Sequence, residues 1–381
     1  QLSDAFQRHV AGTLNGPFDG MDHPRLAAHS STAQPGRGTM SITCIGLDLA
    51  KSVFQVHGID ASGGAVVRRR LARSQLLPFF ARLQPLLIGM EACSSAHHWA
   101  RELMRLGHEV RLIPPQYVKP YVKRNKTDAA DAEAICEAVG RPNMRFVPIK
   151  TPDQQAVLAL HRVRSLLVRQ RTATINALRG LLGEFGIVAG KGAARLDDLR
   201  RRVGSEADEE LPAVARKAID ELFGRLDDLA ARVEAVEAEI IAWHKGNEAS
   251  QRLAMAPGIG PITASALVAS VGDARQFRSS RHFAAWLGLT PRMASSGDRQ
   301  RIGRISKGGD RYLRTLLIHG ARAVIGAFKR PNLKPRPWLS PLLARRPVPV
   351  AATALAHKTA RAVWAMLVRG ETYHKQEAHP A

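Results

Sequence analysis

Two aspartates stand three residues apart in the segment KTDAADAEAI, residues 126–135, which we expect to be helical. On a helix, Asp128 and Asp131 would share one face about one turn apart. Two like charges this close repel each other, so either solvent screens them or a cation lies between them. Because an isolated D-x-x-D pair is most often a solvated helix face, this spacing alone does not identify a site.

Two further carboxylates lie where predicted strands end. Asp48 closes the apolar run SITCIGLD, and Glu91 closes PLLIGME. If these strand ends meet the helical pair in one cleft, the four carboxylates suit two hard divalent cations, Mg²⁺ foremost, because Mg²⁺ prefers oxygen ligands. Two such ions stabilise the attacking and leaving oxygens of a phosphodiester displacement.

Other interpretations of these acids stay open. Asp48 could cap a turn, and Glu91 could pair with one of the many arginines. An early strand aspartate also occurs in the ATP sites of sugar kinases, but the first domain has no glycine-rich phosphate loop to support that chemistry.

A segment with two serines is surrounded by cations. Ser295 and Ser296 precede Gly297 in PRMASSGDRQRIGRISKGGDRYLR, and no nearby histidine could activate them. Taken alone, the segment is typical of a polar loop. Its cations suit phosphate binding and stabilisation of a reacting phosphate as a group, although some could simply face solvent: Arg292, Arg299, Arg301, Arg304, Lys307, Arg311 and Arg314.

The segment MAPGIGPITASALVA predicts a helix-hairpin-helix. Pro257, Gly258 and Gly260 allow a tight turn whose backbone N–H groups can face a phosphate. A turn between two packed helices is the alternative. With Lys126 beside the aspartate pair, the two glycines are candidate nucleic-acid contacts.

The composition points to a nucleic-acid partner. The 381 residues carry 56 Lys and Arg against 33 Asp and Glu, a formal charge of +23 with a sequence pI near 11.0. Such an excess favours a polyanion, because phosphate neutralisation releases counterions; a solvated basic surface is the alternative.

The three cysteines lack disulfide or zinc spacing, no apolar run reaches the ~18 residues of a membrane span, and no signal peptide is recognisable. We expect a cytoplasmic, nucleoid-associated protein with no membrane partner.

The first part of the chain divides into two regions. Residues 1–39 are rich in Gly, Pro and small polar residues, and we expect a disordered extension. In residues 40–150, the runs SITCIGLD, SVFQVHGI, PLLIGME and GHEVRLIP predict four strands, and residues 127–139 form the helix with the two aspartates. This mixture predicts an α/β sheet covered by helices.

The middle of the chain, residues 151–248, predicts a long helical hairpin. Apolar residues from Ile219 to Trp243 recur at spacings of three and four, which is typical of a coiled-coil seam. An earlier helix at residues 153–185 repeats the pattern less cleanly. The seam serves either packing within the chain or dimerisation.

The remainder is predicted to be mainly helical. Residues 249–370 contain the helix-hairpin-helix and a final helix near residues 351–367, and residues 371–381 form a tail. Between residues 251 and 350 there are 18 Lys and Arg against 3 Asp and Glu, so much of the nucleic-acid affinity should lie here.

Six motifs, in this order, resemble the DEDD insertion-sequence transposases: GLDLAKSVFQV, MEAC, KTDAADA, MAPGIGPITA, GLTPRMASSG and GRISKGGDRYLR. This Piv-invertase-like family has a RuvC-like (RNase H-like) N-terminal domain and includes the bridge-RNA-guided recombinases. The resemblance runs from about residue 42 to residue 369 and leaves out only the N-terminal extension and the tail.

The resemblance implies a DNA transposase and recombinase that acts by phosphodiester transesterification. The family's metal-binding acids correspond here to Asp48, Glu91, Asp128 and Asp131, with Mg²⁺, two ions, as cofactor. Its essential serine corresponds to Ser296, or to Ser295 if the alignment slips by one residue. This serine would attack DNA and form a covalent phosphoserine link.

The resemblance also implies partners. They are DNA (element ends and target), a structured noncoding guide RNA, and further copies of the chain in a dimer or tetramer, in which the RuvC-like domain of one protomer meets the serine domain of another.

Two other function classes stay open. One is a junction-resolving nuclease that uses water, with Ser296 merely structural; the other is a non-catalytic DNA-binding protein. A covalent protein–DNA adduct would exclude the first, and metal-dependent strand cleavage would exclude the second.

Overall fold

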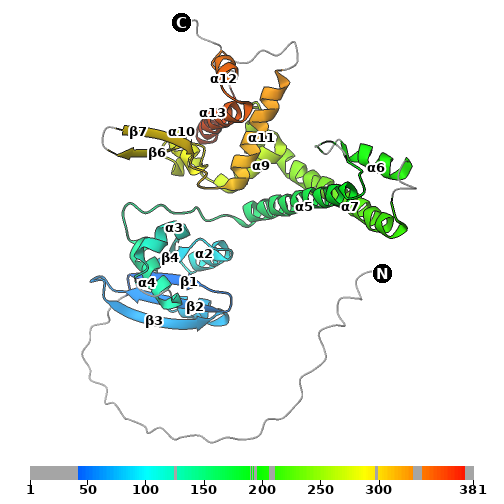
Figure 1. Ribbon diagram of the computed structural model, residues 1–381. Coiled ribbons are helices and arrows are strands. Elements are labelled where there is room, and N and C mark those ends of the chain that lie inside the picture. Colours follow the sequence, from blue (N-terminus) through cyan, green and yellow to red (C-terminus); the bar gives the residue numbers. More distant parts are fainter. Residues whose placement is uncertain are drawn as a thin grey trace, which may run out of the picture.

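The computed structural model describes residues 42–123, 127–188, 190, 192, 195–205, 211–296, 299–328 and 337–373. The predicted disordered extension and most of the predicted tail lie outside these residues. Buried apolar side chains gather around an N-terminal sheet, inside a helical hairpin and among C-terminal helices. Figure 1 shows these three regions, with the sheet below and the C-terminal helices above one end of the hairpin. Within the described ranges, no helix combines the length and the apolar composition that a bilayer span needs.

The N-terminal region is built on a five-stranded sheet with the order β3-β2-β1-β4-β5. Its strands are β1 (Cys44–Leu49), β2 (Val53–Ile59), β3 (Ala65–Ala72), β4 (Leu87–Glu91) and β5 (Glu109–Ile113). β1, β2 and β3 pair antiparallel, whereas β1, β4 and β5 run parallel. The four predicted strands are confirmed. β3 was not predicted, because three consecutive arginines interrupt its apolar residues; an edge strand tolerates such charges.

The two faces of this sheet carry different helices. Side chains alternate along a strand, so Ile45 and Leu47 join the cluster that contains α1 (Leu76–Phe80) and α2 (Ala96–Arg105). Cys44 and Gly46 lie on the other face, against α4. The predicted aspartate helix is confirmed as α4 (Asp128–Val139), and η1 (Arg73–Gln75), α3 (Pro115–Val118) and η2 (Lys119–Tyr121) connect the larger elements.

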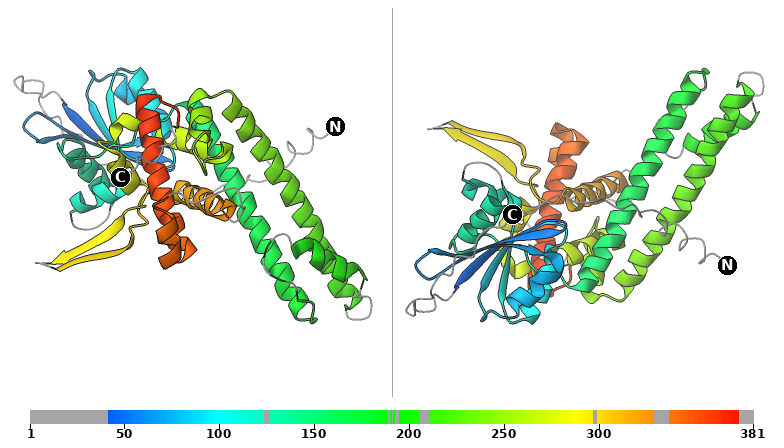
Figure 2. Two further views of the ribbon diagram at one scale, coloured as in Figure 1. Left: turned by 90° about the horizontal axis from the view of Figure 1, so that it is seen from above. Right: turned by 90° about the horizontal axis from the view of Figure 1, so that it is seen from below.

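The predicted helical hairpin consists of α5 (Pro152–Gly183) and α7 (Ala213–Lys245), with α6 (Leu196–Ser205) packed on them. Figure 2 shows the two long helices side by side, projecting away from the rest of the molecule. The seam is buried within the single chain at Ile219, Leu226, Leu229, Val233 and Ile240. Of its two possible roles, packing within the chain is therefore the one that the structure supports.

The C-terminal helices pack around one core: α8 (Glu248–Ala254), α9 (Pro261–Val271), η4 (Ala274–Gln276), α10 (Ser280–Trp286), α11 (Arg311–Ala327), α12 (Ser340–Arg345) and α13 (Val348–Arg369). The predicted final helix is confirmed as α13. It begins earlier than expected, because Pro347 is its N-cap and the first turn of a helix tolerates proline.

The segment with the two serines is not the polar loop that its composition indicates. It forms an antiparallel hairpin of β6 (Pro291–Ser296) and β7 (Arg299–Ile305), and Figure 2 shows this hairpin projecting from the helices. Its apolar side chains are few, and Met293 and Ile302, which pair across the hairpin, are both exposed. A strand with so little buried surface leaves a weak alternation in the sequence.

A buried histidine joins the hairpin helices to the C-terminal region. His161 of α5 lies with Nδ1 3.1 Å from the Tyr312 hydroxyl and Nε2 3.1 Å from Ser265 Oγ. Because the Ser265 hydroxyl donates to the carbonyl of Pro261, Nε2 must carry the proton and Nδ1 accepts from Tyr312. Burial, followed by repulsion from Arg164, lowers the pKa of His161 to about 4.

Candidate active site

Two of the predicted acidic residues lie at the ends of neighbouring parallel strands. Asp48 is the penultimate residue of β1, and Glu91 is the last residue of β4. Strand alternation places Asp48 on the same face as Gly46, and Glu91 on the same face as Gly89. Both carboxylates therefore start from the face of the sheet that α4 covers.

The other two predicted acids occupy the first turn of α4. Thr127 is the N-cap, and its hydroxyl accepts a hydrogen bond from the backbone N–H of Ala130 at 3.2 Å. Asp128 and Asp131 follow in the first turn. The positive end of the helix dipole lies there and stabilises each carboxylate by about 0.3–1 kcal/mol. This offsets part of their mutual repulsion, so the pair by itself does not require a cation.

Two glycines allow α4 to lie directly on the strands. A Cβ at Gly46 would overlap the carbonyl oxygen of Ala132 and lie 2.7 Å from Cys136 Cβ, and a Cβ at Gly89 would lie 2.7 Å from Val139 Cβ. Gly46 and Gly89 are register partners on β1 and β4, so together they form a flat seat for the helix. This seat was not predicted from the sequence. The signal was a glycine two residues before each strand-end acid, in GLD and GME.

The four carboxylates interact electrostatically. Burial raises the pKa of Asp48 to about 6, and repulsion from Asp131, Asp128 and Glu91 contributes to the rise. The backbone N–H of Leu49, which donates to the Asp48 carboxylate, acts in the opposite direction. Asp48 therefore lies close enough to the other three predicted acids for their charges to act on it.

The chemistry of this site fits a hard divalent cation. All the candidate ligands are carboxylate oxygens, and a cation would offset the repulsion that Asp48 experiences. In the part of the chain that the structure describes, no three His, Cys, Asp or Glu side chains are arranged so that they could together hold one ion. Mg²⁺ is usually bound by one or two carboxylates, with water and substrate phosphates as its other ligands, and the observed arrangement suits that mode.

The two candidate serines end β6 at the tip of its hairpin. Ser295 pairs with Gln300, and Ser296 pairs with Arg299. The structure describes only the backbone of these four residues, and Gly297 lies outside the described residues. At the base of the hairpin, the guanidinium of Arg292 donates to the carbonyl of Ser306 through Nη2 at 3.1 Å. The acids and the serines are thus carried by different regions of the chain.

The predicted phosphate-binding cations separate into exposed and buried residues. Arg314 is only 8 % exposed, and its Nη1 donates to the carbonyls of Leu287 and Gly308 at 2.9 and 2.8 Å. Its guanidinium holds the loop before α11 against the end of α10, so we correct its assignment from phosphate binding to packing. Lys126 and the side chain of Arg299 lie outside the description. The exposed members are Arg292, Arg301, Arg304, Lys307 and Arg311.

The predicted helix-hairpin-helix segment forms α8, a turn and α9. Gly258 has a φ of 83°, and a Cβ on it would lie 2.9 Å from the backbone of Gly320 in α11. Close packing therefore accounts for Gly258. Gly260 is the exposed N-cap of α9, and apart from its chain neighbours no described residue has an atom within 4 Å of its Cβ position, so a ligand can approach it.

Comparison with known proteins matches both halves of the chain. A DEDD family model described as "Transposase" covers residues 45–187, which include the four acids. A model described as "Transposase IS116/IS110/IS902 family" covers residues 250–336, which include the serine hairpin.

Similar proteins extend over most of the chain. A probable family 20 transposase of Pseudomonas aeruginosa is 56% identical over 88% of this chain and 99% of its own length. The transposase for insertion sequence element IS1111A of Coxiella burnetii is 44% identical over 88% of this chain and 93% of its own length. The transposase for insertion sequence element IS1328 of Yersinia enterocolitica is 40% identical over 88% of this chain and 99% of its own length. The chain therefore belongs to the IS110/IS116 family of DEDD transposases.

Proposed function

We propose that this transposase cuts DNA with the help of its acidic site and rejoins it through a serine. Transposases cut and join DNA strands, and the formal charge of +23 suits such a substrate. The observation that carries the proposal is geometric: Asp48 and Glu91 end the neighbouring strands β1 and β4, and α4, which starts with Asp128 and Asp131, packs on the same face of the sheet. The strand order, with acids on the central parallel strands β1 and β4, supports a RuvC-like fold for the proposed domain at residues 40–150.

The acids hold the divalent cation in this proposal. Asp48, Glu91, Asp128 and Asp131 are the ligands, with Mg²⁺ as the metal and two ions as the proposed number. When bound, Mg²⁺ supplies stabilisation of the charge on the attacking and leaving oxygens. The chain itself contributes orientation: the sheet fixes Asp48 and Glu91, and the Thr127 cap with the glycine seat fixes the start of α4.

Ser296 is the proposed nucleophile. Its hydroxyl oxygen bonds to the phosphorus of a DNA phosphodiester, and one strand end leaves as the hydroxyl that takes up the proton. The phosphoserine ester conserves the bond energy, so a second strand end can later displace the serine. Ser295 is the alternative. The exposed Arg301, Arg304 and Lys307 are suited to offset the phosphate charge that otherwise repels the oxygen.

Further copies of the chain and a guide RNA complete the proposal. An isolated two-stranded hairpin is marginally stable in water, so the exposed Met293 and Ile302 support a contact of β6–β7 with another protomer. We propose a homo-oligomer in which the serine domain at residues 249–370 meets the RuvC-like domain of a partner, with residues 151–248 as the connecting hairpin. The family resemblance supports a structured noncoding RNA that selects donor and target DNA.

Trapping the adduct tests the serine. The full-length protein is incubated with Mg²⁺ and a nicked suicide substrate of an element end, then analysed on a denaturing gel and by mass spectrometry of the trapped peptide. We expect an adduct on Ser296 that Ser296→Ala removes and Ser295→Ala retains. Cleavage without any adduct would instead favour the water-using nuclease.

The role of the acids in metal binding is tested separately, by substitutions on α4, which carries two of them. Asp131→Asn should abolish Mg²⁺-dependent cleavage and leave DNA affinity nearly unchanged. Glu137→Gln is the matched control, because Glu137 lies on the same helix and pairs with Arg141 at 2.7 Å. If Asp131→Asn cleaves DNA as the wild type does, the metal assignment is wrong. DNA binding without cleavage in the wild type would favour the non-catalytic binding protein.

A further inference from the structure

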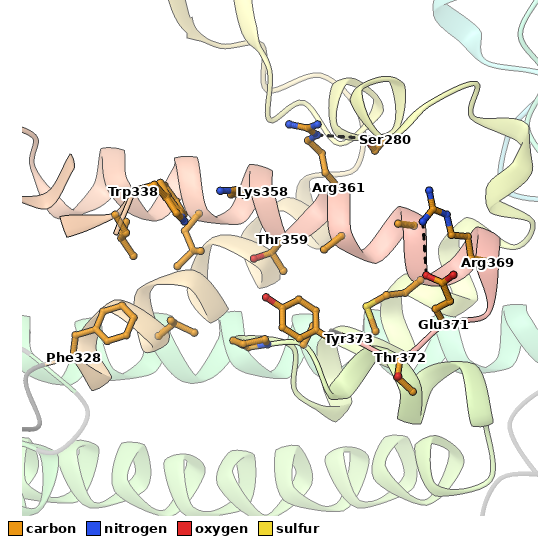
Figure 3. A pocket seen from close by; sticks show the side chains of 18 residues that line it. Ser280, Phe328, Trp338, Lys358, Thr359, Arg361, Arg369, Glu371, Thr372 and Tyr373 are labelled. Atoms are coloured by element: carbon orange, nitrogen blue, oxygen red, sulfur yellow. Dashed lines mark hydrogen bonds and ion pairs between the residues drawn. The ribbon is translucent and has the colours of Figure 1, made fainter. Parts of the chain in front are cut away.

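A pocket of about 430 Å³ lies among the C-terminal helices. Figure 3 shows it beside α13, with residues that follow α13 lying across it. Gly370, whose φ is 70°, ends α13 in the left-handed conformation and turns the chain back, so that Tyr373 lines the same pocket as Met366. None of its lining residues belongs to the acidic site or to the serine hairpin. Its volume is within the range of roughly 300–1,000 Å³ that small-molecule sites occupy.

Aromatic rings form part of its wall. Phe328 follows α11, Trp338 precedes α12, and Tyr373 follows α13, so three separate segments each bring one ring to the pocket (Figure 3). The indole nitrogen of Trp338 is buried and has no hydrogen-bond partner among the described residues.

Cations lie along one side of the same pocket. Lys358, Arg361 and Arg369 are exposed and follow the helical spacing i, i+3, i+11 on one face of α13. Lys358 Nζ lies 4.5 Å from the centre of the Trp338 ring, and Arg361 Nε donates to Ser280 Oγ at 3.4 Å. Among the lining residues the one carboxylate is Glu371, which lies 3.8 Å from Arg369 Nη1. The pocket therefore presents an excess of positive charge next to flat apolar rings.

Rings beside cations suit a ligand with a planar base and a phosphate. In a duplex the bases are stacked and paired, so only an unpaired nucleotide could place its base in the pocket. We propose that this pocket binds an unpaired nucleotide of a nucleic-acid strand, with the base against Trp338 and the phosphate near Lys358 and Arg361. The inference rests on the action of the protein on nucleic acid, but not on the serine or on the metal site.

The test compares two probes on the full-length protein. One is a twelve-nucleotide single strand of thymidine, and the other is the same strand with abasic positions throughout. Trp338→Leu should weaken binding of the thymidine strand by roughly 5- to 150-fold, the range expected for one stacked base, and should leave the abasic strand unaffected. Trp338→Phe keeps a ring and should retain most of the affinity. Fluorescence anisotropy at a fixed salt concentration measures the affinity for each strand, and thermal melts confirm that the variants fold.

The role of the cations that line the pocket is tested with two arginine substitutions, one inside the pocket and one outside it. Arg361→Gln should weaken both probes and lower the salt dependence of binding by about one unit of slope. Arg322→Gln removes an exposed arginine of α11 that does not line the pocket, and it should change neither probe more than a few-fold.

The outcomes separate this inference from the proposed function. If the wild type binds neither duplex nor single strand, nucleic-acid handling itself is refuted. If duplex binding is intact but Trp338→Leu binds the thymidine strand as tightly as the wild type, the pocket inference is overturned. Displacement of the thymidine strand by micromolar thymidine monophosphate would assign the pocket to free nucleotides and would also overturn it.

Discussion

Replacing Gly46 with alanine should lift α4 off the sheet. The new Cβ would overlap the carbonyl oxygen of Ala132 and lie 2.7 Å from Cys136 Cβ. Non-bonded carbon atoms are best separated by roughly 3.5–4.0 Å, so α4 and β1 must move apart by about 1 Å. The nearest neighbours are helix backbone atoms, which cannot rotate away as the end of a flexible side chain can.

The magnitude follows from this displacement. Overpacking a buried contact costs about 1–3 kcal/mol, and we expect the free energy of unfolding to fall by this amount. Because α4 carries Asp128 and Asp131, the same movement changes their position relative to Asp48. Misplacing a reacting group by about 1 Å can cost roughly 10²-fold in rate, so cleavage should fall by this factor. DNA affinity should change little, since the exposed cations stay in place.

Gly140→Ala is the matched control. Gly140 follows the same helix, and apart from its chain neighbours none of the residues that the structure describes has an atom within 4 Å of its Cβ position. Urea unfolding followed by circular dichroism gives the stability, and cleavage of a labelled element end at saturating Mg²⁺ gives the rate. Wild-type stability in Gly46→Ala would refute the close packing of α4 on β1. Reduced stability with wild-type cleavage would refute the link between this packing and the chemistry.

Three further predictions concern charge and packing. Asp48→Asn should stabilise the metal-free protein by about 1–2 kcal/mol at pH 7.5, allowing for partial exposure, because the raised folded pKa makes the Asp48 charge unfavourable above about pH 6. This gain should disappear below about pH 4, and equal melting temperatures in EDTA at pH 7.5 would contradict the prediction. The folded pKa of His161 is lowered, so wild-type stability should decrease by about 2–3 kcal/mol as the pH falls from 6.5 towards 4. His161→Gln cannot titrate and should reduce this slope in urea unfolding; an unchanged slope would count against the buried network. Arg314→Lys should destabilise the fold by about 2–4 kcal/mol, because two hydrogen bonds from a buried guanidinium are disturbed, without changing DNA affinity per folded molecule. A selective loss of DNA affinity would return Arg314 to phosphate binding.

The sequence determined much of the acidic site, because strand ends and helix starts are local features. Asp48 and Glu91 end apolar runs, and Asp128 and Asp131 follow a threonine cap, so each acid could be assigned to its element from a few neighbouring residues. The helical hairpin was predictable for the same reason, since its seam repeats over many turns. Charge is a property of the whole composition, and it pointed to nucleic acid without any structure.

Tertiary structure decided how these elements meet. The order of the strands makes β1 and β4 neighbours, and Gly46 and Gly89 let α4 approach closely enough for its aspartates to act on Asp48. The edge strand β3 and the serine hairpin bury too little apolar surface to leave a clear periodicity, so their pairing had to be observed.

The roles of single residues also depended on distant segments. Arg314 is no different in sequence from the exposed arginines near it, but carbonyls of Leu287 and Gly308 surround its guanidinium. The seam of α7 could equally have met a second copy of the chain, and the structure directs it to α5. Whether a residue is buried depends on which distant segments of the chain pack against it. The spacing of residues along one segment does not contain this information.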